Sequence, residues 1–185
     1  MASTVLNVLH EMLSPRRPYC QLPPLIYLDI GFATGVPAAR LQIQMIKTQH
    51  EDPLVKNFVQ LCSSDKEGYK NSPVEMLDKL HGLVILGEVV CGQRNGLGSV
   101  SLSKLTQKPQ EVPEGSVMML PRAENASQFN SVFYITTQKQ TIHEGELIGQ
   151  VEKGLSQLKH LVQDFGTNHG ERPRKTCYVQ DCGQI

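Results

Sequence analysis

The sequence predicts a mainly β fold, a closed antiparallel β-barrel of about eight strands capped by two α-helices, with an extra N-terminal helix. Short runs rich in β-forming residues recur along the chain, and two well-separated amphipathic helical patterns interrupt them. The length of 185 residues is that of one domain with a sizeable core. We therefore divide the chain into residues 1–23, a helix with a Pro-rich linker, and residues 24–185, the barrel domain.

The composition is that of a neutral globular protein. Hydrophobic residues make up 39% of the chain and charged residues 19%, with 18 basic against 18 acidic side chains. A chain without net charge has no long-range attraction for nucleic acid or for an anionic membrane, so neither is a predicted partner. No uninterrupted apolar run approaches the roughly 20 residues that span a bilayer.

The cysteines are odd in number and widely scattered: Cys20, Cys62, Cys91, Cys177 and Cys182. This distribution favours reduced thiols in an intracellular protein, cytoplasmic or nuclear, over a disulfide framework. The first thirteen residues lack a basic n-region, so they do not read as a signal peptide. The cysteines and histidines lack the spacing of zinc ligands, so no metal site and no cofactor is predicted.

A short helical pattern spans residues 3–13. Its apolar face comprises Val5, Leu6, Val8, Leu9, Met12 and Leu13. Ser14-Pro15 ends the pattern, and the prolines up to Pro24 indicate an extended linker. Because an isolated helix this short is marginal in water, we expect its apolar face to dock on its own domain, or else on a partner or a longer parent protein.

The barrel domain begins with two β-rich runs, residues 25–32 and 40–46, and the turn signals at 33–37 between them indicate a hairpin. Apolar and polar side chains alternate in the second run, which is the period of a half-buried strand. Further strands are predicted at 83–90, 117–120, 132–136, 147–151 and 176–180.

Two helices are predicted to cap this barrel. The first spans residues 52–62, with Pro53 in its first turn and several apolar residues on one side. The second spans residues 152–164, where leucines recur at helical spacing and Gly166 follows the end.

Five short segments follow one another in a specific order: Pro24–Ile30, Gly68–Ser72, Ser131–Thr137, Phe165–Gly170 and Asp181–Ile185. In this order and at this spacing they resemble the cyclophilins, the β-barrel family of peptidyl-prolyl isomerases. The last two segments are very similar to the family's final turn and C-terminal strand. The resemblance extends over residues 24–185 and implies the same capped barrel.

The resemblance also implies where an active site would lie. A cyclophilin holds a prolyl peptide in an apolar pocket while an arginine contacts the twisting amide, whose rotational barrier without help is about 18–20 kcal/mol. The arginine position falls on Met76 when counted from Ser72, and on Asp78 when counted back from Gly82. Neither is a cation, so the group that would stabilise the twisted amide is missing.

The other positions of the family's pocket also differ in this chain, and several of them lose a polar side chain. Where the family has Phe-Met-x-Gln, the chain has Leu83, Val84, Ile85 and Leu86, so an aliphatic side chain replaces the glutamine. Five further positions differ from the family's residues. Pro121 replaces an asparagine, Val132 replaces a glutamine, Tyr134 replaces a phenylalanine, Ile142 replaces a tryptophan and His143 replaces a leucine. The loss of this many polar contacts predicts a role other than isomerisation.

We therefore predict a catalytically inactive cyclophilin-like domain that acts as a protein–protein interaction module, the C-terminal part of a larger intracellular protein. The predicted partner is a protein or a peptide segment. The predicted binding surface comprises Leu83, Leu86, Leu120, Phe133, Tyr134, Ile142 and Arg122. The alternative for these apolar residues is that they have filled the former pocket and become core.

Two other functions stay open at this stage. One is a weak peptidyl-prolyl isomerase that uses Lys79, or an arginine from elsewhere such as Arg122, as its cation. The other is a structural domain that binds nothing in its groove. The sequence leaves the oligomeric state and the identity of the partner undetermined.

Overall fold

The computed structural model of the chain describes residues 22–33, 35–65, 68–87, 100–101, 109–122, 125–168 and 170–185. At 100–101, 122, 125–128 and 130 it describes the backbone alone. The predicted N-terminal helix over residues 3–13 lies outside the described residues. Within the described ranges, no helix is long and apolar enough to cross a membrane.

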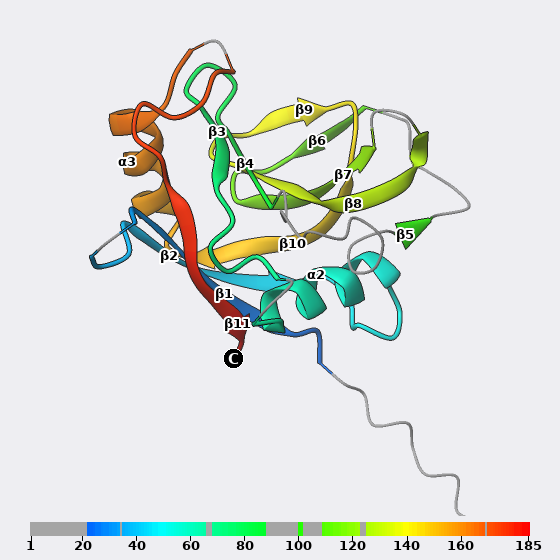
Figure 1. Cartoon of the computed structure of the whole chain (residues 1–185). Coiled ribbons are helices and arrows are strands. Elements are labelled where there is room, and N and C mark those ends of the chain that lie inside the picture. Colours follow the sequence, from blue (N-terminus) through cyan, green and yellow to red (C-terminus); the bar gives the residue numbers. More distant parts are fainter. Residues whose placement is uncertain are drawn as a thin grey trace, which may run out of the picture.

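The described part of the chain consists mainly of β-strands (Figure 1). The strands are β1 (Leu25–Gly31), β2 (Ala39–Met45), β3 (Val74–Asp78), β4 (Leu83–Leu86), β5 (Val100–Ser101), β6 (Gln110–Val112), β7 (Ser116–Arg122), β8 (Asn125–Thr136), β9 (Gln140–Ile142), β10 (Glu146–Lys153) and β11 (Tyr178–Gln184). The helices are α2 (Pro53–Ser63) and α3 (Leu155–Phe165).

The main sheet is antiparallel and follows the order β11-β1-β2-β10-β7-β8-β4-β3, with β5 paired to β8 off this path. Its two ends meet where the amide of Val74 donates to the carbonyl of Cys177 and the amide of Val179 donates to that of Ser72, both at 2.9 Å. The sheet is therefore a nearly closed barrel with two helices, which confirms the predicted fold class except for the N-terminal helix. Strands β6 and β9 pair with each other in a separate two-stranded ribbon.

The inside of the barrel is filled by side chains that point inward from alternate positions along the strands. At the α2 end, Phe58, Tyr69 and Phe133 pack with ring centroids 5.0–5.4 Å apart. The Tyr69 hydroxyl donates to the carbonyl of Ser131 at 2.8 Å, so this aromatic cluster ties α2 to β8.

Helix α2 begins at Pro53, one residue after the predicted start, because Asp52 is its N-cap. The Asp52 carboxylate accepts a hydrogen bond from the amide of Leu54 at 2.8 Å and so caps the first turn. Helix α3 begins at Leu155, three residues later than the predicted 152. The reason is that β10 continues to Lys153, which pairs with Gln42 of β2. Gly154 then turns the chain into the helix at a φ of 91°.

The strand boundaries differ from the predicted ones in several places. Strands β3, β6 and β9 have no predicted counterpart, because runs of three to five residues with mixed polarity carry little periodicity. Strand β8 extends from Asn125, well before the predicted 132, and the closing strand β11 spans 178–184 instead of 176–180. Of the predicted strand at 83–90, the structure shows 83–86, and residues 88–90 lie outside the described ranges.

Candidate binding face and side cavity

A second, smaller hydrophobic cluster lies on the outer face of the barrel. Four of its side chains are buried: Val112, Met118, Tyr134 and Ile142. Four partly buried side chains pack against them: Leu83, Ile85, Leu120 and Leu147. We call these eight residues the outer cluster. Every member is a hydrocarbon or a thioether except the phenol of Tyr134.

The outer cluster exists because alternate residues of four neighbouring strands point away from the barrel interior. In β4, for example, Val84 and Leu86 belong to the barrel core while Leu83 and Ile85 belong to the outer cluster. The β6–β9 ribbon brings Val112 and Ile142 onto this outer face, and Figure 1 shows the ribbon beside β7 and β8.

Three of the predicted surface and pocket residues lie inside the barrel instead. Leu86, Val84 and Phe133 are fully buried members of the barrel core. Leu86 pairs with Phe133 across β4 and β8, so both side chains point inward together. The prediction that Leu86 and Phe133 contribute to an outer surface is therefore wrong, and Ile85, paired with Tyr134, takes the outward position.

The remaining predicted residues lie at or near the outer face. Tyr134 and Ile142 are 3% and 7% exposed, so they form its floor. Leu83, Leu120, Pro121 and Val132 are half-buried, and His143 is exposed. The side chain of Arg122 lies outside the described residues. The sequence analysis missed Val112, Met118, Ile85 and Leu147, which strand alternation alone identifies once the register is known.

The Tyr134 hydroxyl is used within the fold. It donates to the carbonyl of Glu144 at 3.1 Å. Burial raises the pKa of this phenol, and the nearby Glu144 carboxylate raises it further. Tyr134 therefore stays neutral at physiological pH and closes the floor of the outer cluster instead of offering a charge.

Met76 and Asp78, the two candidates for the arginine position, lie in different surroundings. Met76 is half-buried, pairs with Ile85 across β3 and β4, and has its thioether beside Gly170. Asp78 is 4% exposed, and its carboxylate is occupied by the turn that joins β3 to β4. Strands β3 and β4 carry no cationic side chain at all.

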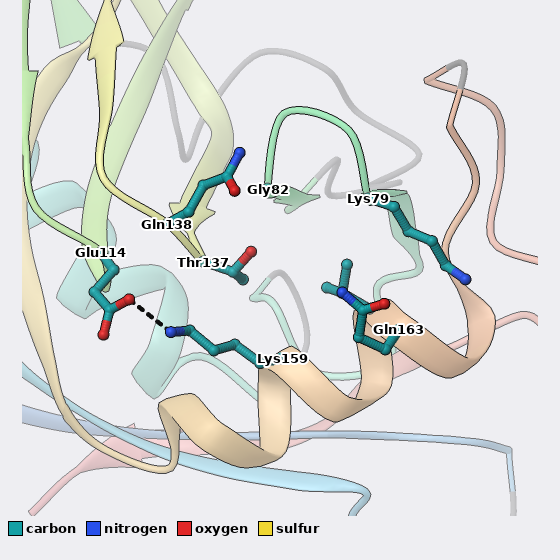
Figure 2. A pocket seen from close by; sticks show the side chains of 8 residues that line it. Lys79, Gly82, Glu114, Thr137, Gln138, Lys159 and Gln163 are labelled. Carbon is teal, nitrogen blue, oxygen red and sulfur yellow. Dashed lines mark hydrogen bonds and ion pairs between the residues drawn. The ribbon is translucent and has the colours of Figure 1, made fainter.

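A side cavity of about 250 Å³ opens between α3 and three turns of the barrel (Figure 2). It is lined by Lys79, Gly82, Glu114, Thr137, Gln138, Lys159, Val162 and Gln163. Lys159 of α3 forms an ion pair with Glu114 at 2.6 Å, drawn as a dashed line in Figure 2. Within the described residues, no group of histidine, cysteine and carboxylate side chains could hold a metal ion.

Lys79 belongs to this side cavity. Its amide donates to the carbonyl of Thr167 at 2.9 Å, and its aliphatic stem passes close to Gly166 at the end of α3. The side chain therefore packs toward α3, whereas the outer cluster lies on the face to which the β6–β9 ribbon contributes Val112 and Ile142. This placement separates Lys79 from the face on which a prolyl peptide would be expected.

Comparison with known proteins identifies the family. The model of the cyclophilin-type peptidyl-prolyl cis-trans isomerase/CLD family matches residues 38–184. Among solved structures, the chain is similar to the crystal structure of the Mimivirus cyclophilin, with a TM-score of 0.67 and 21% sequence identity over 91% of this chain and 92% of that one. The chain therefore belongs to the cyclophilin family, as its sequence motifs predict.

Proposed function

We propose that this cyclophilin domain is catalytically inactive as a prolyl isomerase and serves as a protein–protein interaction module. The observation that carries the proposal is the outer cluster, in which apolar side chains occupy the face where the resemblance expects polar contacts to a prolyl peptide. The position of the catalytic cation holds either the thioether of Met76 or a carboxylate already bonded within its own turn, Asp78.

The physical argument concerns the charge that rotation creates. As the prolyl C–N bond twists, its nitrogen gains a lone pair, and a nearby cation stabilises that state more than the planar amide. Hydrocarbon side chains offer no such preference between the two states. A face built from Leu83, Ile85 and Leu120 can bind an apolar segment without lowering the barrier to its isomerisation.

The exposed parts of the outer cluster are what a partner would touch. Leu83, Ile85, Leu120 and Leu147 are half-buried, so each still has apolar surface in contact with water. Covering one aliphatic side chain contributes at most about 1.5–3 kcal/mol, and a few such anchors make a specific contact. The partner we expect is a protein segment with apolar side chains.

A pull-down from cell extract with matched variants tests this role. Leu83→Asp and Leu120→Asp place a charge on the outer cluster, and Val36→Asp, at an 87% exposed position on another turn, is the control. We expect partners retained by the wild type and by Val36→Asp to be lost with either outer-cluster variant. Thermal unfolding must show that both variants fold. Retention of the same partners by all three variants would contradict the proposal.

Family membership favours a second candidate, weak prolyl isomerase activity. Lys79 packs toward α3, which leaves Arg122 at the end of β7 as the better cation for this alternative. Loss of any activity in Arg122→Ala would support it.

We also propose an intracellular location and a place near the C-terminus of a larger protein. Cys62, Cys177 and Cys182 are free and buried, in agreement with a reducing compartment. Fractionation of cells with an antibody against the domain would test the location, and the apparent mass of the detected band would test the larger parent protein.

A further inference from the structure

The side cavity carries an inference of its own. We propose that it binds a peptide carboxylate, with the anion beside Lys79 and the peptide main chain against the polar side chains of the cavity wall. The proposal concerns α3 and the neighbouring turns, so it does not depend on the outer cluster or on the proposed function of that face.

The charges of the cavity favour an anion. Two lysines, Lys79 and Lys159, line it together with one carboxylate, Glu114. Lys159 and Glu114 neutralise each other at 2.6 Å, whereas Lys79 has no ion-pair partner among the described residues. One positive charge is therefore left beside the cavity, on the Lys79 side chain, which extends away from the other labelled side chains (Figure 2). A ligand with a single carboxylate complements this charge.

The neutral groups of the wall suit a peptide main chain. The amide nitrogen of Gln138 donates to the carbonyl of Leu80 at 3.3 Å, which fixes this side chain while its amide oxygen can still accept. The side-chain amide of Gln163 and the hydroxyl of Thr137 have no hydrogen-bond partner within the part of the chain that the structure describes. Together they offer donors and acceptors to the N–H and C=O groups of a bound peptide.

The size of the cavity limits what enters. About 250 Å³ lies just below the volume of a typical small-molecule site, so a short segment of one or two residues fits. Gly82 and Val162 add an apolar part to the wall for the aliphatic portion of such a segment. An aspartate or glutamate side chain and a free chain terminus both supply the required carboxylate.

Titration of the ¹⁵N-labelled protein with three N-acetylated tripeptides tests the proposal. Acetyl-Ala-Glu-Ala-amide carries the side-chain anion, acetyl-Ala-Ala-Ala with a free C-terminus carries the terminal anion, and acetyl-Ala-Gln-Ala-amide carries neither. We expect amide shifts at Gly82, Thr137, Gln138 and Gln163 with at least one anionic peptide and not with the neutral one. The anionic peptide that binds more tightly identifies the source of the carboxylate.

Two charge variants sharpen the test. Lys79→Met should weaken the binding of the anionic peptide about two- to fivefold, the effect of one solvent-exposed ion pair. Lys56→Met, an exposed lysine on α2, is the matched control and should leave binding unchanged. Glu114→Gln should tighten binding, because it removes the competing carboxylate and releases Lys159. Raising the salt concentration should weaken binding in every case.

Equal shifts with the glutamine peptide, no shifts with any peptide, or an unchanged affinity in Lys79→Met would each overturn the proposal. None of these results bears on the outer cluster, because Leu83→Asp and Leu120→Asp change another face and are read out by another assay. Failure of the carboxylate site and failure of the proposed interaction module are therefore distinguishable.

Discussion

Asp78 shows how a single residue can lie near the expected active-site position and yet serve the fold. Its carboxylate accepts hydrogen bonds from the amides of Leu80 at 2.8 Å and His81 at 3.1 Å, and it contacts the His81 ring at 2.7 Å. Burial opposes ionisation of this group, but the hydrogen bonds from His81 and Leu80 outweigh it and lower the pKa. Asp78 thus holds the turn between β3 and β4.

Replacing Asp78 should destabilise this turn. We expect Asp78→Ala to lower the free energy of unfolding by about 1–2 kcal/mol, as for the loss of a capping carboxylate, and Asp78→Asn to cost less because it can still accept from the two amides. The pKa of Asp78 is lower in the folded state than the unfolded value of about 3.9. Its contribution is therefore fully present above that value and is lost as the pH falls through the folded-state pKa.

Urea unfolding over a range of pH measures this effect. The stability difference between wild type and Asp78→Ala should be largest near neutral pH and should shrink as the pH is lowered below about 4. His81→Ala isolates the contribution of the ring. Equal stability of wild type and Asp78→Ala at pH 7 would show that the carboxylate does not hold the turn.

At single positions, the sequence predicts chemistry better than orientation. The absence of a cation at Met76 and Asp78 is readable from the residues themselves. The inward orientation of Leu86 is not, because a shift of one residue in strand register turns every side chain to the other face. Pairing of Ile85 with Tyr134 fixes that register, and such pairing is a property of the folded sheet.

At the level of elements, the junction between β10 and α3 depends on Gly154. The residue adopts a φ of 91°, and a Cβ there would collide with the carbonyl oxygen of Arg40. Backbone strain alone at such a position costs about 1–3 kcal/mol. We expect Gly154→Ala to lower the free energy of unfolding by more than this, because the collision adds to the strain. Gly35, with a φ of 112° and no atom within 4 Å of an added Cβ, provides the control.

Thermal unfolding of the two glycine variants gives the comparison. Gly35→Ala should show the effect of backbone strain without a collision, so its loss of stability should be the smaller one. A loss in Gly154→Ala no larger than that in Gly35→Ala would mean that the contact with Arg40 does not constrain the junction.

The elements that the sequence predicts are the long amphipathic ones. Helix α2 is identified by Pro53, the preceding Asp52 and an apolar side, and β2 by its alternation. Strands β6 and β9 are three residues each, and they become strands because they pair with each other over the outer face. Pairing between distant short segments is a tertiary effect that local patterns do not contain.

At the scale of the whole molecule, a barrel of the cyclophilin type carries two surface features, the outer cluster and the side cavity. The closure between β3 and β11 and the two helices fix a framework of the cyclophilin type. On that framework, the outer cluster supplies apolar contacts and the side cavity supplies a charged, polar recess. A fold does not determine a function, so the residues at each face must carry the functional argument.

The most direct test of the central claim is NMR exchange spectroscopy of an Ala-Pro-Phe type peptide with the domain at high concentration. Uncatalysed exchange takes tens to hundreds of seconds. We predict that the domain leaves the cis–trans exchange rate unchanged, while a cyclophilin with an intact arginine, the positive control, accelerates it. Clear acceleration by this domain, abolished in Lys79→Ala or Arg122→Ala, would contradict the account and establish a prolyl isomerase with a relocated cation.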